Sequence, residues 1–293
     1  MSQIALEIRS YLTERKNAPP LPTLQEARAS YEEMASKIPL FPNTEIEKIE
    51  INGIKAEWVI APNIDKSHVV LYLHGGAYVL GSPNTHRALA SRISASTKAK
   101  VLLLDYRLAP EHPFPSAIED SCSAYRWLIQ QGFSNNNIFI CGDSAGGGLT
   151  LATVISLRDA QESLPKRIAL ISPWTDLAAT GESLTTLSEI DPWLESKELT
   201  DLALLYLAGS DAKNPLASPL FANLEALPDM LIQVGSDEIL LDDSTRLAKL
   251  AKASGVDVTL EVWEGMWHVW HAFADKLVEG QEAIDNIGKF FRS

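Results

Sequence analysis

The chain is poor in the features that mark secreted, membrane-spanning or nucleic-acid-binding proteins. Its 293 residues include only two cysteines, Cys122 and Cys141, too few for a disulfide framework. No run of about 18 apolar residues occurs, so the sequence offers no membrane-spanning helix. Lysine and arginine total 25 against 38 acidic residues, with no basic cluster. This balance argues against nucleic acid and anionic membrane surfaces as partners.

The N-terminal segment also lacks the apolar core of a secretory signal, because polar and charged residues interrupt its hydrophobic positions between Met1 and Lys16. Together with the two cysteines, this pattern predicts a reduced, cytoplasmic protein. The 46% hydrophobic content is that of an ordinary globular chain. A chain of this length can bury a large core without a disulfide or a metal.

Short apolar runs alternate with helical patterns from residue 45 onward. Residues 45–51 and 54–60 are predicted to form a hairpin, since Asn52-Gly53 is a typical two-residue turn. Further apolar runs follow at 68–73, 100–106, 137–141, 167–171, 230–234 and 257–263. Their alternation with helices predicts an α/β fold with a mostly parallel sheet covered on both faces.

Two segments interrupt this alternation. Residues 1–42 are typical of two helices, separated by the proline-rich stretch 18–22, and Thr23 and Glu26 form a capping-box pattern at the start of the second. A stretch much longer than an ordinary loop separates the runs at 167–171 and 230–234. Because this stretch is rich in leucine and tryptophan, we predict a helical insertion over 178–212 that packs on the sheet domain.

The segment Gly142-Asp-Ser-Ala-Gly146 has the form G-x-S-x-G and joins an apolar run to a helical pattern. In a sharp strand–turn–helix, glycines on both sides of a serine avoid collisions with its strained backbone. This context predicts that Ser144 is a nucleophile exposed above a sheet. The alternative is a glycine-rich turn with an incidental serine.

A serine hydroxyl is a weak nucleophile and needs a base. His268 and His271 follow the last apolar run, where a loop leaving the carboxyl end of the sheet would approach Ser144. His268 is favoured because it lies nearer the strand end, whereas His271 is expected on a helix face. The other four histidines lie elsewhere in the sequence and are not expected to be the base: His68, His74, His86 and His112.

Asp237 is the predicted acid that orients this base, because it follows the run at 230–234 in the turn before a helical pattern. The adjacent Glu238 is expected to point elsewhere. An alternative role for Asp237 is to cap the helix that follows.

An oxyanion site is predicted at His74-Gly75-Gly76-Ala77, directly after the run at 68–73. Two successive glycines let backbone N–H groups point into a site without a side chain in the way. We expect the amides of Gly75 and Gly76, with that of Ala145, to donate hydrogen bonds to a tetrahedral intermediate.

These motifs resemble those of the hormone-sensitive-lipase family of bacterial carboxylesterases, in the α/β-hydrolase superfamily. The order Ser144, Asp237, His268 along the chain is the one typical of that superfamily. The resemblance covers essentially the whole chain. Its motifs are His74-Gly-Gly-Ala-Tyr78, Asp105-Tyr-Arg-Leu-Ala-Pro-Glu-His-Pro-Phe-Pro115, Gly142-Asp-Ser-Ala-Gly-Gly147, Ser172-Pro-Trp-Thr-Asp176 and the block around Asp237 and His268.

The resemblance implies an α/β-hydrolase fold, with an eight-stranded, mostly parallel sheet and a helical cap. The cap corresponds to residues 1–42 and 178–212, and the catalytic domain to residues 43–177 and 213–293. The resemblance also implies cleavage of short-chain acyl esters and a homodimer formed through the eighth strand and the last helix.

We therefore expect a serine carboxylesterase that acts on a small-molecule ester through an acyl-enzyme intermediate, without a cofactor or a metal. An ordinary histidine titrates near pH 6.5, so activity should fall as the pH drops through about 6.5 and the base becomes protonated. Two alternatives are an amidase, peptidase or deacetylase that uses the same triad, and a catalytically silent receptor on the same fold.

Overall fold

The computed structural model describes residues 2–19 and 21–293. In this part of the chain, one sheet contains eight strands in the order β1-β2-β4-β3-β5-β6-β7-β8. The pairs β1–β2 and β2–β4 are antiparallel, and all other neighbouring strands are parallel. The prediction of a mostly parallel, eight-stranded sheet is therefore confirmed. The strands are β1 (Glu45–Ile51), β2 (Ile54–Ile60), β3 (Asp65–Leu73), β4 (Ala99–Leu104), β5 (Ile138–Asp143), β6 (Arg167–Ile171), β7 (Asp229–Gly235) and β8 (Val258–Trp263).

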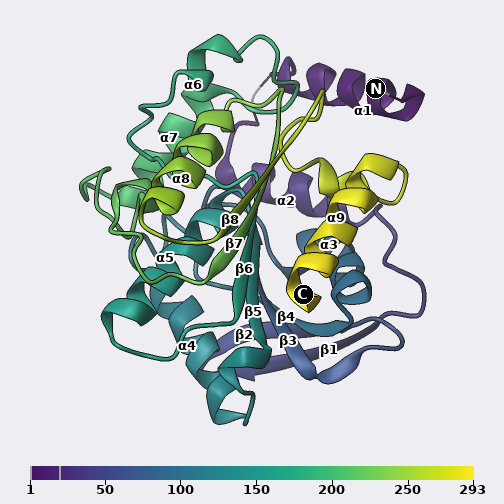
Figure 1. Ribbon diagram of the computed structural model, residues 1–293. Coiled ribbons are helices and arrows are strands. Elements are labelled where there is room, and N and C mark those ends of the chain that lie inside the picture. Colours follow the sequence, from purple (N-terminus) through teal and green to yellow (C-terminus); the bar gives the residue numbers. More distant parts are fainter. Residues whose placement is uncertain (1, 20) are drawn as a thin grey trace.

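Helices cover both faces of the sheet, as predicted (Figure 1). On one face, α3 (Pro83–Thr97) packs beside α9 (Val278–Arg292). The other face carries α4 (Ser116–Gln130), α5 (Ala145–Asp159) and α8 (Leu241–Ala253). The interior parallel strands β3 to β7 are thus buried on both sides, which is why their sequences are nearly continuous apolar runs, whereas the edge strand β8 is partly exposed.

Strand β3 shows how one sequence serves both faces. Leu71 and Leu73 pack in the core on the α4/α5 side, whereas Val70 and Tyr72 pack in the core on the α3/α9 side. Successive side chains of a strand point to opposite faces of its sheet, so an unbroken apolar run contributes to two cores at once. The carboxyl end of β3 then delivers the loop that begins at His74 to the edge of the sheet where β5 also ends.

The hairpin between β1 and β2 has the predicted turn. Asn52 and Gly53 have φ angles of +51° and +85°, as a type I′ turn requires at both central positions. Ile51 therefore pairs with Ile54, and the predicted strand boundaries 45–51 and 54–60 are confirmed.

The two segments that interrupt the strand–helix alternation contain short helices. These are α1 (Gln3–Lys16), α2 (Leu24–Ala35), α6 (Ser183–Thr186) and α7 (Ser196–Leu207). The Thr23 hydroxyl accepts a hydrogen bond from the Glu26 amide at 3.2 Å and caps α2 as predicted. The predicted break at 18–22 includes Pro20, which lies outside the described residues. Figure 1 shows α1 and α6 at the same end of the molecule.

Within the described residues, no helix has both the length and the apolar composition needed to cross a bilayer.

Candidate active site

Ser144 occupies a strained turn between β5 and α5. Its backbone has φ +54° and ψ −121°, a conformation that residues with a side chain rarely adopt. A Cβ atom on Gly142 would overlap the Gly146 carbonyl, and one on Gly146 would overlap the Leu73 carbonyl. The turn can form only with glycine at both positions, and it has the predicted strand–turn–helix geometry.

His268 lies on the loop after β8 and contacts a buried carboxylate. Its Nδ1 atom is 3.1 Å from Oε2 of Glu238, and the two side chains are 5% and 0% exposed. Burial raises the pKa of Glu238 above its ordinary value, although the neighbouring His268 lowers it in part. The edge of the Trp193 ring packs against the imidazole, with the ring centroids 6.0 Å apart. The ring of His268 is therefore oriented by a carboxylate and an indole.

The prediction that Asp237 orients His268 is wrong. The Asp237 carboxylate instead pairs with Arg9 of α1, with Nη1 and Oδ2 2.8 Å apart, and accepts a hydrogen bond from the Ser236 hydroxyl. The adjacent Glu238, which was expected to point elsewhere, faces the histidine. Neighbouring side chains in a turn diverge, so the spacing along the sequence does not decide which carboxylate reaches the ring. Asp237 does not cap the following helix either, since the N-cap of α8 is Leu240.

The residues on both sides of Glu238 are tied to the segments outside the sheet domain. The Ile239 amide donates to Oδ2 of the buried Asp191 at 2.9 Å. On the other side, Asp237 pairs with Arg9. The sequence analysis did not single out Asp191 or Arg9. The position of Asp191 between a helical pattern and Pro192 gives no signal for such a long-range contact.

Helix α1 also holds the segment that contains Asp191. The Nζ atom of Lys16 donates to the backbone carbonyls of Ser188 and Asp191 at 2.7 and 2.8 Å. Arg9 Nη2 donates to the Ile190 carbonyl at 2.6 Å. Two cations of one helix thus fix the loop that in turn bonds to the amide next to Glu238.

The loop over residues 74–78, here called the oxyanion loop, follows β3 beside the Ser144 turn. Its last three residues, Gly76, Ala77 and Tyr78, have φ angles of +115°, +53° and +63°. The amides of Gly76, Ala77 and Ala145 donate to no acceptor within residues 2–19 and 21–293. They are free to bind an oxygen atom of a ligand.

The prediction that Gly75 contributes a free amide is wrong. Its N–H group donates to Oδ1 of Asp143 at 3.1 Å, so it is already engaged. A Cβ atom at position 75 would overlap the Asp143 carboxylate. Glycine is required here because a carboxylate approaches the backbone closely, and this reason could not be read from the sequence.

His271 is a structural residue, in agreement with its expected position on a helix face. It lies in a 3-10 turn, Trp270–Phe273, and its Nε2 atom is 2.9 Å from the Gln233 side-chain oxygen. Burial lowers its pKa to about 3. His74 is likewise fully buried and stacked on Tyr106, and burial lowers its pKa to about 3. Both rings are therefore uncharged at neutral pH, each with a single N–H group.

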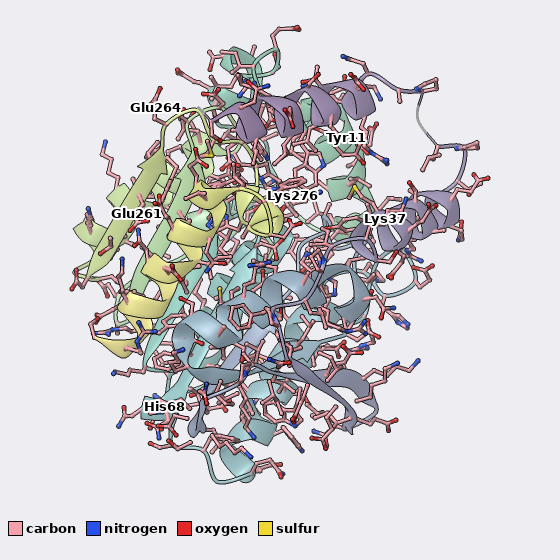
Figure 2. The ribbon with its side chains drawn as sticks, turned by 90° about the vertical axis from the view of Figure 1, so that its right-hand side faces the viewer. Tyr11, Lys37, His68, Glu261, Glu264 and Lys276 are labelled. Carbon is pink, nitrogen blue, oxygen red and sulfur yellow. The ribbon has the colours of Figure 1, made fainter. Side chains whose placement is uncertain are left out.

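A cavity of about 570 Å³ opens between α1, α2 and the segment 272–276. Apolar side chains dominate its wall, including Ile8, Met34, Trp193 and Phe273. Figure 2 labels three other residues that line it, Tyr11, Lys37 and Lys276. Trp193 is shared between this wall and the His268 contact. The volume is typical of a small-molecule site. No group of three or more metal-ligating side chains is found among the described residues.

Comparisons with known proteins identify the family of this chain. A family model described as alpha/beta hydrolase fold matches residues 70–272. An acetyl-hydrolase from Streptomyces hygroscopicus is 45% identical over 84% of this chain and 82% of its own length. An esterase from Acinetobacter venetianus is 36% identical over 91% of this chain and 88% of its own.

Solved structures show the same similarity over the full length. An esterase from the bacterial hormone-sensitive lipase family superposes with a TM-score of 0.97 at 46% identity, covering 100% of this chain and 98% of that one. The esterase EstE5, in crystals soaked with p-nitrophenyl butyrate, gives a TM-score of 0.95 at 47% identity over the same shares. The chain belongs to the hormone-sensitive-lipase family of esterases, within the α/β-hydrolase fold, and it is a carboxylic ester hydrolase.

Proposed function

We propose that Ser144, His268 and Glu238 form a catalytic triad that hydrolyses short-chain acyl esters through an acyl-enzyme intermediate. The observation that carries this proposal is the 3.1 Å contact between Glu238 and His268 Nδ1, in a site whose serine sits on a strained turn. A carboxylate on Nδ1 fixes the tautomer in which Nε2 is free to accept a proton.

The proposed reaction has two halves. His268 Nε2 takes the proton of the Ser144 hydroxyl while Oγ attacks the ester carbonyl carbon. The tetrahedral intermediate then collapses, the alcohol oxygen leaves with the proton from His268, and the acyl group remains on Ser144. Water attacks this acyl-enzyme by the same route and releases the carboxylic acid. Glu238 stabilises the imidazolium that forms in each half.

The free amides of Gly76, Ala77 and Ala145 are the proposed oxyanion donors. Their N–H groups have no partner among the described residues, and Ala145 begins α5, where the helix dipole also favours negative charge. Hydrogen bonds that strengthen as the carbonyl oxygen gains charge lower the barrier rather than merely improving binding.

Aromatic rings packed on Tyr78, the last residue of the oxyanion loop, support a short acyl group. Tyr78 stacks on Tyr206, with ring centroids 3.8 Å apart, and lies 6.3 Å from the ring of Trp174. All three side chains are buried, so they occupy space that a longer acyl chain would need. We assign the roomier cavity beside Trp193 to the apolar part of the alcohol.

We assign residues 1–42 and 178–212 to a cap over the active site, and residues 43–177 and 213–293 to the catalytic domain. The contacts of Arg9 and Asp191 with the residues around Glu238 support this division, since both segments meet at the triad.

We also assign the protein to the cytoplasm and to a homodimer. Both cysteines are free and buried. β8 is an edge strand that leaves the Val262 side chain 47% exposed, and Val278 at the start of α9 is 65% exposed. Sedimentation of the wild type and of Val262→Lys tests the dimer, because a charge on a paired edge disrupts it.

The decisive experiment is hydrolysis of p-nitrophenyl esters from C2 to C12 by the wild type and by Ser144→Ala. We expect a preference for the short chains and a loss of about 10³-fold or more in the variant. Acid quenching during turnover, followed by mass spectrometry, should find the acyl group on the peptide that contains Ser144. A folded wild type no faster than the variant on every ester, but active on the matched anilides, would replace the ester with an amide as substrate.

A further inference from the structure

A second buried histidine–carboxylate pair lies directly behind the proposed nucleophile. His86 Nε2 is 3.3 Å from Oδ2 of Asp143, and each side chain is 4% exposed. Asp143 immediately precedes Ser144, and His86 lies in the first turn of α3, after the oxyanion loop. No step of the proposed reaction uses this pair.

The Asp143 carboxylate is surrounded by donors. It accepts hydrogen bonds from the Tyr72 hydroxyl at 2.7 Å and from the Gly75 amide at 3.1 Å, in addition to His86. Burial by itself would raise the pKa of Asp143, but His86 and the Tyr72 hydroxyl hold it below its ordinary value. The carboxylate is therefore ionised. Because an ionised carboxylate only accepts hydrogen bonds, Nε2 of His86 must carry the proton.

The His86 ring has one fixed orientation. Its Nδ1 atom lies 2.7 Å from the Thr85 hydroxyl. The edge of Tyr31 packs against it with centroids 6.0 Å apart, and the ring of His74 lies 5.2 Å away. A buried ring with a polar partner at each end and aromatic neighbours on its sides cannot turn without breaking these contacts.

We propose that His86 is a positioning residue for ester hydrolysis, which acts through Asp143 on the Gly75 amide and so fixes the oxyanion loop. The inference rests on the proposed function, because it concerns the same reaction. Asp143 connects three elements at one point: the serine turn by its own backbone, the oxyanion loop through Gly75, and α3 through His86. If His86 is lost, Oδ2 of Asp143 loses its partner and only the bonds of Oδ1 to the Tyr72 hydroxyl and the Gly75 amide remain, so the carboxylate can shift and carry the amides of Gly76 and Ala77 with it.

Such a shift should change catalysis more than binding. A displacement well under 1 Å leaves the apolar contacts of a bound ester intact, yet the oxyanion donors must lie within about 3 Å of a charge that develops only in the transition state. Loss of a whole donor typically costs about 10²- to 10³-fold in kcat. For a misplaced loop we expect a loss of about 10- to 100-fold, with KM changed less than about 3-fold.

The test compares His86→Gln with His86→Asn. The amide nitrogen of glutamine takes nearly the place of the histidine Nε2 atom, so this variant keeps a donor for Asp143. The amide of asparagine takes the place of Nδ1, so this variant keeps only the contact to Thr85. We expect His86→Gln to retain kcat on p-nitrophenyl butyrate within about 5-fold and His86→Asn to lose the 10- to 100-fold given above.

Two further measurements separate positioning from a purely structural role. The burst of p-nitrophenol counts the correctly folded active sites, so that kcat is expressed per competent site. The affinity for an arylboronic acid, which forms a tetrahedral adduct on the serine, should fall by the same factor as kcat in each variant. Equal kcat per competent site in both variants and the wild type would overturn the inference. So would a loss of kcat without a parallel loss of boronic acid affinity.

The wild type and Ser144→Ala, assayed in parallel, keep this test distinct from that of the proposed function. If both lack esterase activity, the proposed function fails. If the wild type is active and Ser144→Ala is not, the function stands, and the two His86 variants alone decide the inference.

Discussion

The Glu238 carboxylate contacts Nδ1 of His268 at 3.1 Å, and neither side chain is more than 5% exposed. A buried carboxylate is normally costly, and burial does raise the pKa of Glu238. In the proposed mechanism the His268 ring becomes positively charged during turnover, and its contact with Glu238 then offsets this cost.

Replacement of Glu238 by glutamine should therefore abolish most of the activity. The amide can donate to Nδ1 and favour the wrong tautomer, so we expect kcat to fall about 10³- to 10⁴-fold with KM little changed. Asp237→Asn is the matched control, since it removes the same charge one residue away, and it should keep kcat within about 10-fold. Steady-state hydrolysis of p-nitrophenyl butyrate measures both. A larger loss of kcat in Asp237→Asn than in the Glu238 variant would instead assign the orienting role to Asp237.

This pair also shows how far the sequence determines the site. The strand–turn–helix around Ser144, the loop after β8 and the glycines of the oxyanion loop follow from local patterns, and each lies where predicted. The choice between Asp237 and Glu238 depends instead on which side chain meets Arg9, which is 228 residues away from Asp237 in the chain. Likewise, the amide of Gly75 is taken by Asp143 through a contact between two loops. Periodicity and motif spacing do not report contacts of this kind.

Gly75→Ala should disable the oxyanion loop. The added Cβ atom would overlap the Asp143 carboxylate and lie 3.0 Å from the Asp143 carbonyl, so the loop and the carboxylate must separate. We expect kcat to fall by about 100-fold, comparable to the loss of one oxyanion donor. Gly132→Ala, in an exposed turn with φ +90° and nothing within 4 Å of the new atom, is the control. It should cost stability only, and equal kcat losses in the two variants would contradict the assignment.

Arg9→Met should loosen α1 while keeping the apolar stem of the side chain. The variant loses the bonds to Asp237 at 2.8 Å and to the Ile190 carbonyl at 2.6 Å. Hydrogen bonds that involve a charged group contribute about 1.5–3 kcal/mol each when buried, so we expect a loss of about 1–3 kcal/mol for this half-buried pair. Arg15→Met in the same helix is the control, since it loses only a 3.3 Å hydrogen bond to Ser30 and a cation–π contact 6.0 Å from the Tyr11 ring centroid.

Hydrogen exchange of the α1 amides and the free energy of unfolding measure this effect. Faster exchange confined to α1 and the 188–191 segment is the expected result for Arg9→Met. Identical exchange in the two arginine variants would show that the contact with Asp237 does not hold the helix.

The buried histidines should make the protein sensitive to acid. Burial lowers the pKa of both His74 and His271 to about 3, whereas an unfolded histidine titrates near 6.5. Below pH 6.5 the unfolded chain binds protons that the folded chain excludes. The stability that these residues contribute is therefore complete above pH 6.5 and is lost as the pH falls toward 3. Each histidine adds up to about 1.4 kcal/mol per pH unit to the slope.

Urea denaturation between pH 6.5 and 4.5 measures this slope. His271→Gln keeps a donor for Gln233 but cannot titrate, so its free energy of unfolding should fall less steeply with acid than that of the wild type. We expect the number of protons taken up on unfolding to be smaller by close to one in the variant than in the wild type. Parallel slopes for the variant and the wild type would mean that His271 takes up a proton while the protein is still folded.

The two contacts that hold the residues on either side of Glu238 have a consequence for how substrate enters. Arg9 holds Asp237, and Asp191 holds the Ile239 amide, so the segments that we assign to the cap fix the carboxylate from both sides. If these segments move away to admit an ester, Glu238 loses both supports, and His268 loses its orientation. In the proposed mechanism, an open entrance and an assembled triad would then exclude each other in time. An enzyme of this design would be inert while it exchanges ligands with solvent, and the rate at which it closes would set an upper limit on turnover.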